Sequence, residues 1–287
     1  MSRYDTISFL TDYGSADEFV GVCHSVIRSI APDVRVIDVT HQIPRHDVRS
    51  GGLALARSAQ DLAAGVVVAV VDPGVGTDRR PVAVEVGDGA SVLVGPDNGL
   101  LAPAVALVGG ATAAVVLDQP EYHLPALGPT FDGRDVFAPV AAHLCSGVPL
   151  AAVGTSVDPA SLLPSVIPVS EVTVGRAVGE VLWVDHFGNA QLNIDPTDLD
   201  GWGERLRLVI DDDVRVIDRV RNFADIPPGG IGLLIDSYGM LAMAVDRGSA
   251  AAELGLDGGV EVALEAIDDA HPDPGTTSPV SLRPRQD

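Results

Sequence analysis

Four aspartates each follow an apolar segment of the chain: Asp12, Asp38, Asp72 and Asp97. Where strands alternate with helices, ligands bind beyond the carboxyl ends of the strands, so polar side chains there are candidates for chemistry. An aspartate before glycine or proline also forms ordinary turns, and for any one of the four alone a turn is the simpler explanation. Their recurrence favours a ligand site at one edge of a sheet.

The segment "VVDPGVGTDRR", residues 70–80, places Asp72 seven residues before Arg79. Gly74 and Gly76 would let the backbone approach a ligand closely, and the planar guanidinium of Arg79 can hold a carboxylate in a fixed fork geometry. The segment matches neither a Walker loop nor G-x-G-x-x-G, so phosphate binding is weakly supported.

Two further Gly/Asp loops follow, "GPDNGLLAP" at 95–103 and "PTFDGRDVFAP" at 129–139. The second carries Asp132, Gly133 and Asp135, although Asp135 could instead cap the helix that comes after it. Both loops add carboxylates to the candidate site.

In the second half of the chain, "WVDHFGNAQLNI" sets Asp185 and Asn189 four residues apart around a glycine. Together they could offer one acceptor and one amide to a purine or sugar edge, because both are short polar side chains on one turn. A turn without any ligand role is equally compatible with the pattern.

Several other chemistries lack their residues. All 18 basic residues are arginine, which excludes a lysine Schiff base, a lysine-anchored pyridoxal cofactor and a P-loop lysine. The sequence contains no His-x-x-x-His, His-x-His or Gly-x-Ser-x-Gly, and His186 is expected to be a surface or packing residue. Cys23 and Cys145 are expected to be reduced, buried thiols. We therefore expect neither a metal nor a cofactor.

The net charge of −22 argues against DNA, RNA or anionic membranes as partners, and suits a cationic small molecule. The N-terminus lacks a basic-then-apolar signal sequence, and the longest apolar run, Leu62 to Val71, has about half the length that a bilayer requires. The sequence predicts a cytoplasmic protein.

The elements that must position these residues differ between the two halves of the chain. Residues 1–165 alternate strand-like and helix-like segments, and several strands are continuously apolar, which predicts an α/β domain with a mostly parallel sheet covered on both faces. Residues 170–265 are rich in strands separated by turns, which predicts an antiparallel β-barrel-like domain. Residues 266–287 are rich in Pro, Asp and Ser and are expected to be disordered.

The chain resembles the S-adenosyl-L-methionine (SAM) hydrolases that form adenosine, also called SAM hydroxide adenosyltransferases, which are relatives of the fluorinase and chlorinase. The resemblance covers about residues 5–264 and rests on seven blocks in order. These are "FLTDYG", "VIDVTHQIPRHDV", "VVDPGVGTDRR", "VGPDNGLL", "TFDGRDVFAP", "VDHFGN" and "RGSAAAE".

This resemblance implies an N-terminal α/β domain, a smaller C-terminal β-barrel-like domain, and a homotrimer with active sites between subunits. It also implies the reaction, in which a water-derived hydroxide attacks the ribose C5′ of SAM and releases adenosine and methionine. SAM is then the substrate, with no further cofactor.

Site residues follow by matching positions. Asp12 matches the carboxylate that binds the ribose hydroxyls, and Asp185 and Asn189 match adenosine and methionine contacts. Ser237 falls where the family contacts the methionine end, with Tyr238 beside it. The remaining substrate-binding candidates are His46, at the place of an aromatic residue in the halogenases, Phe131, and Gly133, where the chlorinase also has glycine.

For catalysis the family is proposed to use an Asp-Arg-His set, and Asp72 and Arg79 match its first two members. Relatives read Thr-Phe-His-Gly-Arg-Asp where this chain has Asp132 in place of histidine. Two carboxylates beside one arginine cannot both ionise easily, so either Asp72 or Asp132 could have a raised pKa and exchange a proton with water.

Two alternatives stay open at this point. A halogenase is disfavoured, because a carboxylate at Asp72 would repel a halide where halogenases carry tyrosine. A catalytically weakened SAM- or adenosine-binding protein remains compatible with the missing histidine.

Overall fold

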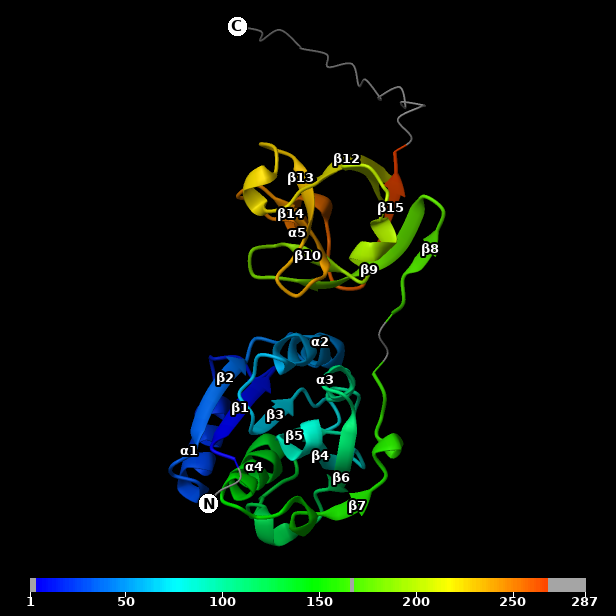
Figure 1. Ribbon diagram of the computed structural model, residues 1–287. Coiled ribbons are helices and arrows are strands. Elements are labelled where there is room, and N and C mark those ends of the chain that lie inside the picture. The colour runs from blue at the N-terminus through cyan, green and yellow to red at the C-terminus, as the bar shows by residue number, and fades with distance from the viewer. Residues whose placement is uncertain (1–3, 166–167, 268–287) are drawn as a thin grey trace, which may run out of the picture. The chain divides into compact units, whose positions relative to one another are not determined.

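The computed structural model describes residues 4–165 and 168–267, and the chain divides into two compact units, Met1–Ile167 and Pro168–Asp287 (Figure 1). The expected tail, residues 266–287, lies outside the described residues from 268 onward, and Ala266 is the last residue of a strand. Among the described residues, no helix is both long and apolar enough to cross a membrane.

The first unit is built on a seven-stranded sheet with the strand order β2-β1-β3-β5-β4-β6-β7. Neighbours are parallel from β2 to β5 and antiparallel from β5 to β7, so five of the seven strands run in one direction. The predicted mostly parallel sheet is confirmed. Its strands are β1 (Thr6–Thr11), β2 (Arg35–Thr40), β3 (Val66–Val70), β4 (Pro81–Val86), β5 (Ser91–Pro96), β6 (Ala111–Val116) and β7 (Thr155–Val157).

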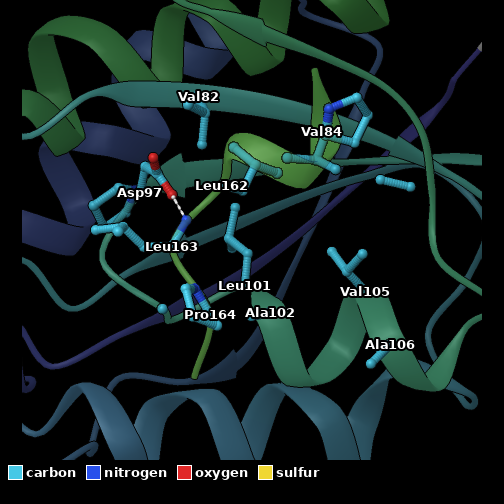
Figure 2. Close-up of a pocket in the computed structure, with 14 residues that line it drawn as sticks. Val82, Val84, Asp97, Leu101, Ala102, Val105, Ala106, Leu162, Leu163 and Pro164 are labelled. Carbon is cyan, nitrogen blue, oxygen red and sulfur yellow. Dashed lines mark hydrogen bonds between the residues drawn. The ribbon is translucent and has the colours of Figure 1, made fainter. Parts of the chain in front are cut away.

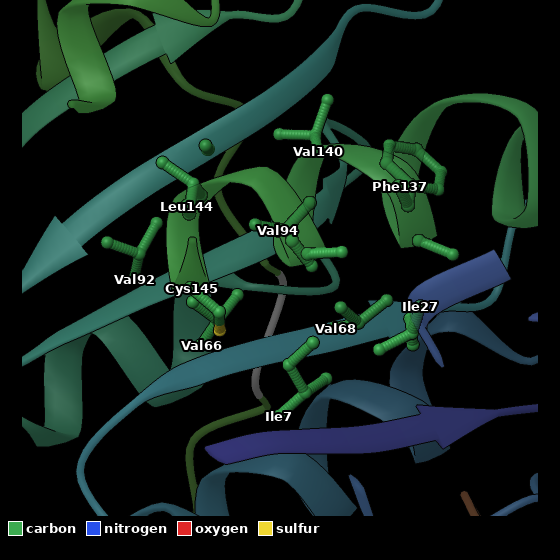
Figure 3. Close-up of a cluster of buried hydrophobic side chains, with 14 of the residues drawn as sticks. Ile7, Ile27, Val66, Val68, Val92, Val94, Phe137, Val140, Leu144 and Cys145 are labelled. Atoms are coloured by element: carbon green, nitrogen blue, oxygen red, sulfur yellow. The ribbon is translucent and has the colours of Figure 1, made fainter. Parts of the chain in front are cut away.

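Helices cover both faces of this sheet. Side chains alternate along β3, so Val66, Val68 and Val70 join a core with α1 (Phe19–Ile30) and α4 (Ala138–Cys145), as Figure 3 shows for part of it. Val67 and Ala69 join a second core on the opposite face, with α2 (Val48–Ala59) and α3 (Ala102–Leu107). A strand buried on both sides has to be apolar throughout, which explains the continuous "VVVAVV" run.

Local signals set the helix ends that matter for the site. Asp47 accepts a hydrogen bond from the backbone N–H of Ser50, so α2 begins at Val48. It ends at Ala59. A π-helical turn, Gly133–Phe137, leads directly into α4.

The second unit is a closed barrel. Its sheet order is β10-β14-β13-β12-β11-β15-β9-β8, and an additional pairing of β10 with β9 closes seven strands around the core, leaving β8 on the outside of β9. All neighbouring strands are antiparallel except β12 and β13. These two are parallel, because residues 220–230 carry the chain back to the end of the barrel where β12 began. The predicted barrel is confirmed, with mixed strand orientation.

The barrel strands are β8 (Glu171–Thr173), β9 (Arg176–Val184), β10 (Ala190–Leu192), β11 (Arg205–Ile210), β12 (Asp213–Arg219), β13 (Ile231–Ile235), β14 (Leu241–Val245) and β15 (Glu261–Ala266), and the helix α5 spans Ala250–Leu254. Short 3-10 turns lie at Gly87–Gly89, Pro120–Tyr122, Leu150–Ala152, Pro159–Ser161, Pro196–Leu199 and Phe223–Asp225.

Candidate active site

A polar cavity of about 570 Å³ opens in the first unit, where β1 and β3 end. Its volume lies within the range usual for small-molecule sites. The lining includes Asp12, His46, Asp72, Phe131, Asp132 and Gly133, all of which the sequence singled out, and also Tyr13, Asp17, Phe19, Arg45, Val70, Val75, Thr130 and Arg134.

Arg79 joins the two candidate catalytic carboxylates of this cavity. Its Nε donates to Asp72 Oδ1 at 3.0 Å, and its Nη2 donates to Asp72 Oδ2 and, at 2.6 Å, to Asp132 Oδ2. The side chains of Arg79 and Asp72 are 7% and 5% exposed, whereas that of Asp132 is 21% exposed. The arginine is therefore a buried bridge, and Asp132 is the member most open to solvent.

The loop after β3 brings these groups together through a close backbone approach. Gly76 has φ of 78°, and a Cβ added there would lie 2.4 Å from the carbonyl oxygen of Pro129. The loop before Asp132 is the group that approaches this glycine closely, and the approach of a ligand to it stays a prediction. The contact fixes Asp72 and Arg79 against Asp132 across 53 residues of sequence.

The two carboxylates are not equivalent. Burial raises the pKa of Asp72, the charge and hydrogen bonds of Arg79 oppose this, and the charge of Asp132 adds to the increase. The net pKa of Asp72 is above its ordinary value. A raised pKa at Asp72 is one of the two outcomes that the sequence left open for this pair of carboxylates.

A hydrogen bond joins His46 to Asp12 in the same cavity. The backbone N–H of His46 donates to Asp12 Oδ2 at 2.9 Å, and His46 has a left-handed φ of 66°. A non-glycine residue in that conformation carries strain, which the hydrogen bond to Asp12 offsets. Both side chains belong to the cavity lining.

An aromatic wall completes the cavity, and sequence reasoning found only one of its members. Phe131 packs edge-on against Tyr13 and Phe19, with centroid distances of 5.7 and 5.2 Å. A Cβ on Gly133 would lie 2.0 Å from the Tyr13 hydroxyl, so that hydroxyl occupies the space a side chain would need. Burial is the largest cause of the raised pKa of Tyr13, which keeps the phenol protonated.

Charged lining residues were also missed. Asp17 and Arg45 offer one charge of each sign, and Arg134 is held by Asp135 through an Nε–Oδ1 contact of 2.6 Å. Asp135 is buried within the π-helical turn and pairs with this arginine, so the alternative that it caps the following helix is wrong.

His123 is a further residue near the catalytic set that no motif indicated. Its Nε2 is buried and has no hydrogen-bond partner among the described residues. Burial lowers the pKa of His123, while the charges of Asp132 and Asp118 oppose that decrease. In the sequence, only the position of His123, nine residues before Asp132, could have drawn attention to it.

Asp97 shows that a strand-end aspartate can be purely structural. Its carboxylate accepts from Arg80 Nε at 2.9 Å and from the backbone N–H of Leu163 at 2.8 Å. The surrounding pocket, of about 230 Å³, is lined mainly by apolar side chains (Figure 2). Of the four strand-end aspartates, only Asp12 and Asp72 line the polar cavity.

The remaining candidates lie in the barrel unit, on two loops of the same design. Asp185 Oδ1 accepts from the backbone N–H groups of Phe187 and Asn189, and Asn189 Nδ2 donates to Asp185 Oδ2 at 2.8 Å. A Cβ on Gly188 would lie 2.0 Å from Ser249 Oγ, which places this loop against the "RGSAAAE" segment.

The second loop holds Ser237 and Tyr238. Asp236 Oδ1 accepts from the backbone N–H groups of Tyr238 and Met240, as Asp185 does in the first loop, and Asp236 Oδ2 accepts from Gln191 Nε2 at 2.6 Å. Each loop exposes an aromatic side chain, with Phe187 75% and Tyr238 55% exposed. Both loops have the sequence pattern Asp-x-aromatic-Gly, and this repeat could have indicated Phe187 as the counterpart of Tyr238.

The first unit carries a carboxylate-rich cavity at its strand ends, and the second is a closed barrel with two polar loops of the same design. This arrangement is typical of a two-domain enzyme that acts on a small molecule. Family models of the SAM hydroxide adenosyltransferase N-terminal and C-terminal domains match residues 7–154 and 179–263. The chain belongs to the SAM hydroxide adenosyltransferase family.

Individual relatives are similar along almost the whole chain. An (R)-S-adenosyl-L-methionine hydrolase of Salinispora arenicola is 46% identical, covering 93% of this chain and all of that protein. An (R)-S-adenosyl-L-methionine hydrolase of Thermus thermophilus is 38% identical, covering 90% of this chain and 98% of that protein. A fluorinase of Nocardia brasiliensis is 29% identical, covering 92% of this chain and 97% of that protein. The crystal structure of an uncharacterized conserved protein from Thermotoga maritima matches with a TM-score of 0.83 and 32% identity, covering 90% and 99%.

Proposed function

We propose that this protein hydrolyses SAM to adenosine and L-methionine. The observation that carries the proposal is the bridge from Asp72 through Arg79 to Asp132 at a cavity of substrate size, in a chain 46% identical to a SAM hydrolase. The protein's net charge of −22 suits a substrate that carries a sulfonium cation.

The reaction needs a water molecule placed in line with C5′. The water oxygen forms the new bond to C5′, the C5′–S bond breaks, and its electron pair stays on sulfur, which turns the sulfonium into the neutral thioether of methionine. Asp72 accepts the water proton, because its raised pKa favours that transfer. Positioning the water supplies on the order of 7–11 kcal/mol of the barrier reduction.

Asp132 takes the place of the family's histidine in this proposal. Its carboxylate holds Arg79 in the bridge, and its charge raises the proton affinity of Asp72. Because Asp132 is the more exposed of the two acids, it also offers a route for the proton to leave for solvent.

Substrate contacts are assigned by chemistry. Asp12 accepts from the ribose hydroxyls, while Asp17 and Arg45 have the charges that complement the ammonium and carboxylate of a methionine moiety. His46, Phe131 and Gly133 shape the cavity. From the barrel, Asp185, Asn189, Ser237 and Tyr238 are assigned to adenosine and methionine.

A homotrimer with active sites between subunits and a cytoplasmic location belong to the same proposal and follow from the family resemblance. The reaction is proposed to need no metal and no cofactor. A halogenase is disfavoured, because the buried carboxylate of Asp72 would repel a halide.

The test is to incubate purified protein with SAM and EDTA and to separate the products by chromatography. Adenosine and methionine in equal amounts support the hydrolase. If SAM binds in a calorimeter but no adenosine forms above the enzyme-free control, the protein is a binding protein. A parallel incubation with chloride that yields 5′-chloro-5′-deoxyadenosine would favour the halogenase.

A further inference from the structure

Two histidines and an aspartate converge outside the substrate cavity. His24 on α1 lies with its Nε2 2.8 Å from Asp38 Oδ1 on β2, and His41, just after β2, places its own Nε2 3.1 Å from the same oxygen. The three donor atoms all lie within 4.8 Å of one another. None of the three residues lines the substrate cavity.

The ring of His41 is held in a fixed orientation. Its Nδ1 is 2.8 Å from Thr11 Oγ1, which also accepts from the backbone N–H of Tyr13, and its ring packs edge-on against Phe9 at a centroid distance of 5.0 Å. The side chain is only 11% exposed. A hydrogen bond to the second ring nitrogen is the usual way in which proteins orient a metal-binding imidazole.

The Nε2 of His41 has no hydrogen-bond partner among the described residues, because its approach to Asp38 lacks the required geometry. This leaves a buried nitrogen 3.1 Å from the Asp38 carboxylate without a hydrogen bond to it, and close to a second imidazole. A cation between them would satisfy all three groups at once, since each offers a lone pair.

We propose that His24, Asp38 and His41 bind a divalent transition-metal ion of the zinc type. Tetrahedral zinc with ligand bonds of about 2.0–2.1 Å separates its ligand atoms by roughly 3.3–3.4 Å. The two distances to Asp38 Oδ1, 2.8 and 3.1 Å, would need only a small increase to match this value. Imidazole ligands select zinc, copper or nickel over magnesium and calcium. The side chains of Asp38 and His24, 44% and 34% exposed, leave the fourth position to solvent.

The sequence does not reveal this site, because His24 lies 14 residues before Asp38 and on a different element. The ion would hold α1 against β2, at the edge of the sheet, and through Thr11 it would brace β1, the strand that Asp12 follows. Its role is to stabilise the first unit, and the proposed hydrolysis does not pass through it.

The experiment measures binding of Zn²⁺ by calorimetry and of Co²⁺ by its visible absorption, using the full chain freed of metal with a chelator. One ion per chain is expected, together with a rise in Tm on adding Zn²⁺. His24→Ala and Asp38→Asn should each weaken binding by at least about 100-fold, and Thr11→Val by about 10–100-fold.

Two variants control for general effects of this acidic chain. His186→Ala removes an exposed histidine of the second unit, and Asp33→Asn removes one exposed negative charge from the turn before β2. Neither should change Zn²⁺ affinity. Binding that survives both His24→Ala and Asp38→Asn, or that falls equally in the controls, would overturn the proposal. No Zn²⁺ binding by the unaltered protein would overturn it as well.

Discussion

Gly76 lies so close to Pro129 that a Cβ on the glycine would be 2.4 Å from the proline carbonyl oxygen. This contact seats the loop of Asp72 and Arg79 on the loop of Asp132, and so links the two halves of the candidate catalytic set. A substitution that pushes these two loops apart would separate Asp72 from Asp132, which Arg79 bridges.

Gly76→Ala should therefore destabilise the fold by about 1–3 kcal/mol, since alanine is strained at φ of 78° and also meets Pro129. Turnover should fall by more than the decrease in the amount of folded protein alone accounts for. Urea unfolding and SAM turnover measure the two effects. Gly74→Ala is the matched control, because its Cβ would make only a 3.4 Å contact with Arg79, and equal losses in both variants would contradict the prediction.

Asp72→Asn should lower kcat by roughly 10²–10⁴-fold, the usual effect of losing a general base. Because the pKa of Asp72 is raised, the acid limb of the wild-type kcat profile should lie above the range of an ordinary aspartate, and the variant should lose that limb. A pH series of initial rates measures this. Asp78→Asn, an exposed aspartate of the same loop, should keep the wild-type profile.

Asp132→Asn should lower turnover by on the order of 10²-fold, because the bridge then lacks its second carboxylate charge. Asp132→His restores the histidine found in relatives and should retain more activity than the asparagine variant. Rates under saturating SAM decide between them. Unchanged turnover in Asp132→Asn would leave Asp72 and Arg79 as the proton-handling pair.

Gly133→Ala should raise KM more than it lowers kcat, because the new methyl group displaces the Tyr13 hydroxyl from the cavity wall. Gly128→Ala is the control, since a Cβ there meets nothing within 4 Å. Steady-state kinetics of both variants test this, and a wild-type KM in Gly133→Ala would show that Tyr13 moves without affecting the substrate.

Stability should fall on acidification through the imidazole range. Burial lowers the pKa of His123 and His143 in the folded chain, so below about pH 6.5 the unfolded chain binds more protons and is favoured. Asp72 acts in the opposite direction at lower pH, because its raised pKa lets the folded chain bind the extra proton. Urea unfolding between pH 7.5 and about pH 5 measures the sum.

His123→Gln and His143→Gln should each flatten this dependence, whereas His186→Gln, at an exposed position, should leave it unchanged. His123→Gln should in addition alter the pH profile of turnover, because the charge of Asp132 acts on the pKa of His123 and the two residues are therefore coupled. A stability profile that is unchanged in both buried-histidine variants would show that other groups carry the acid sensitivity.

The residue pattern was enough to predict the two-domain architecture and six residues of the cavity lining. Continuous apolar strands such as Val66–Val70 can exist only between two layers, and the strand-rich second half could close only as a sheet of its own. Asp12, Asp72 and Asp132 were recognisable because they stand at strand ends and in matching motifs, which are local properties of the chain.

The tertiary structure decided which of these groups act together. Asp97 follows a strand as Asp72 does and also pairs with an arginine, yet it lies in a mainly apolar pocket and does not line the polar cavity. The preferred proton acceptor depends on burial, and the aromatic wall and the His24–Asp38–His41 cluster depend on contacts between distant segments. Desolvation and close approach are properties of the packed chain, so no spacing along the sequence expresses them.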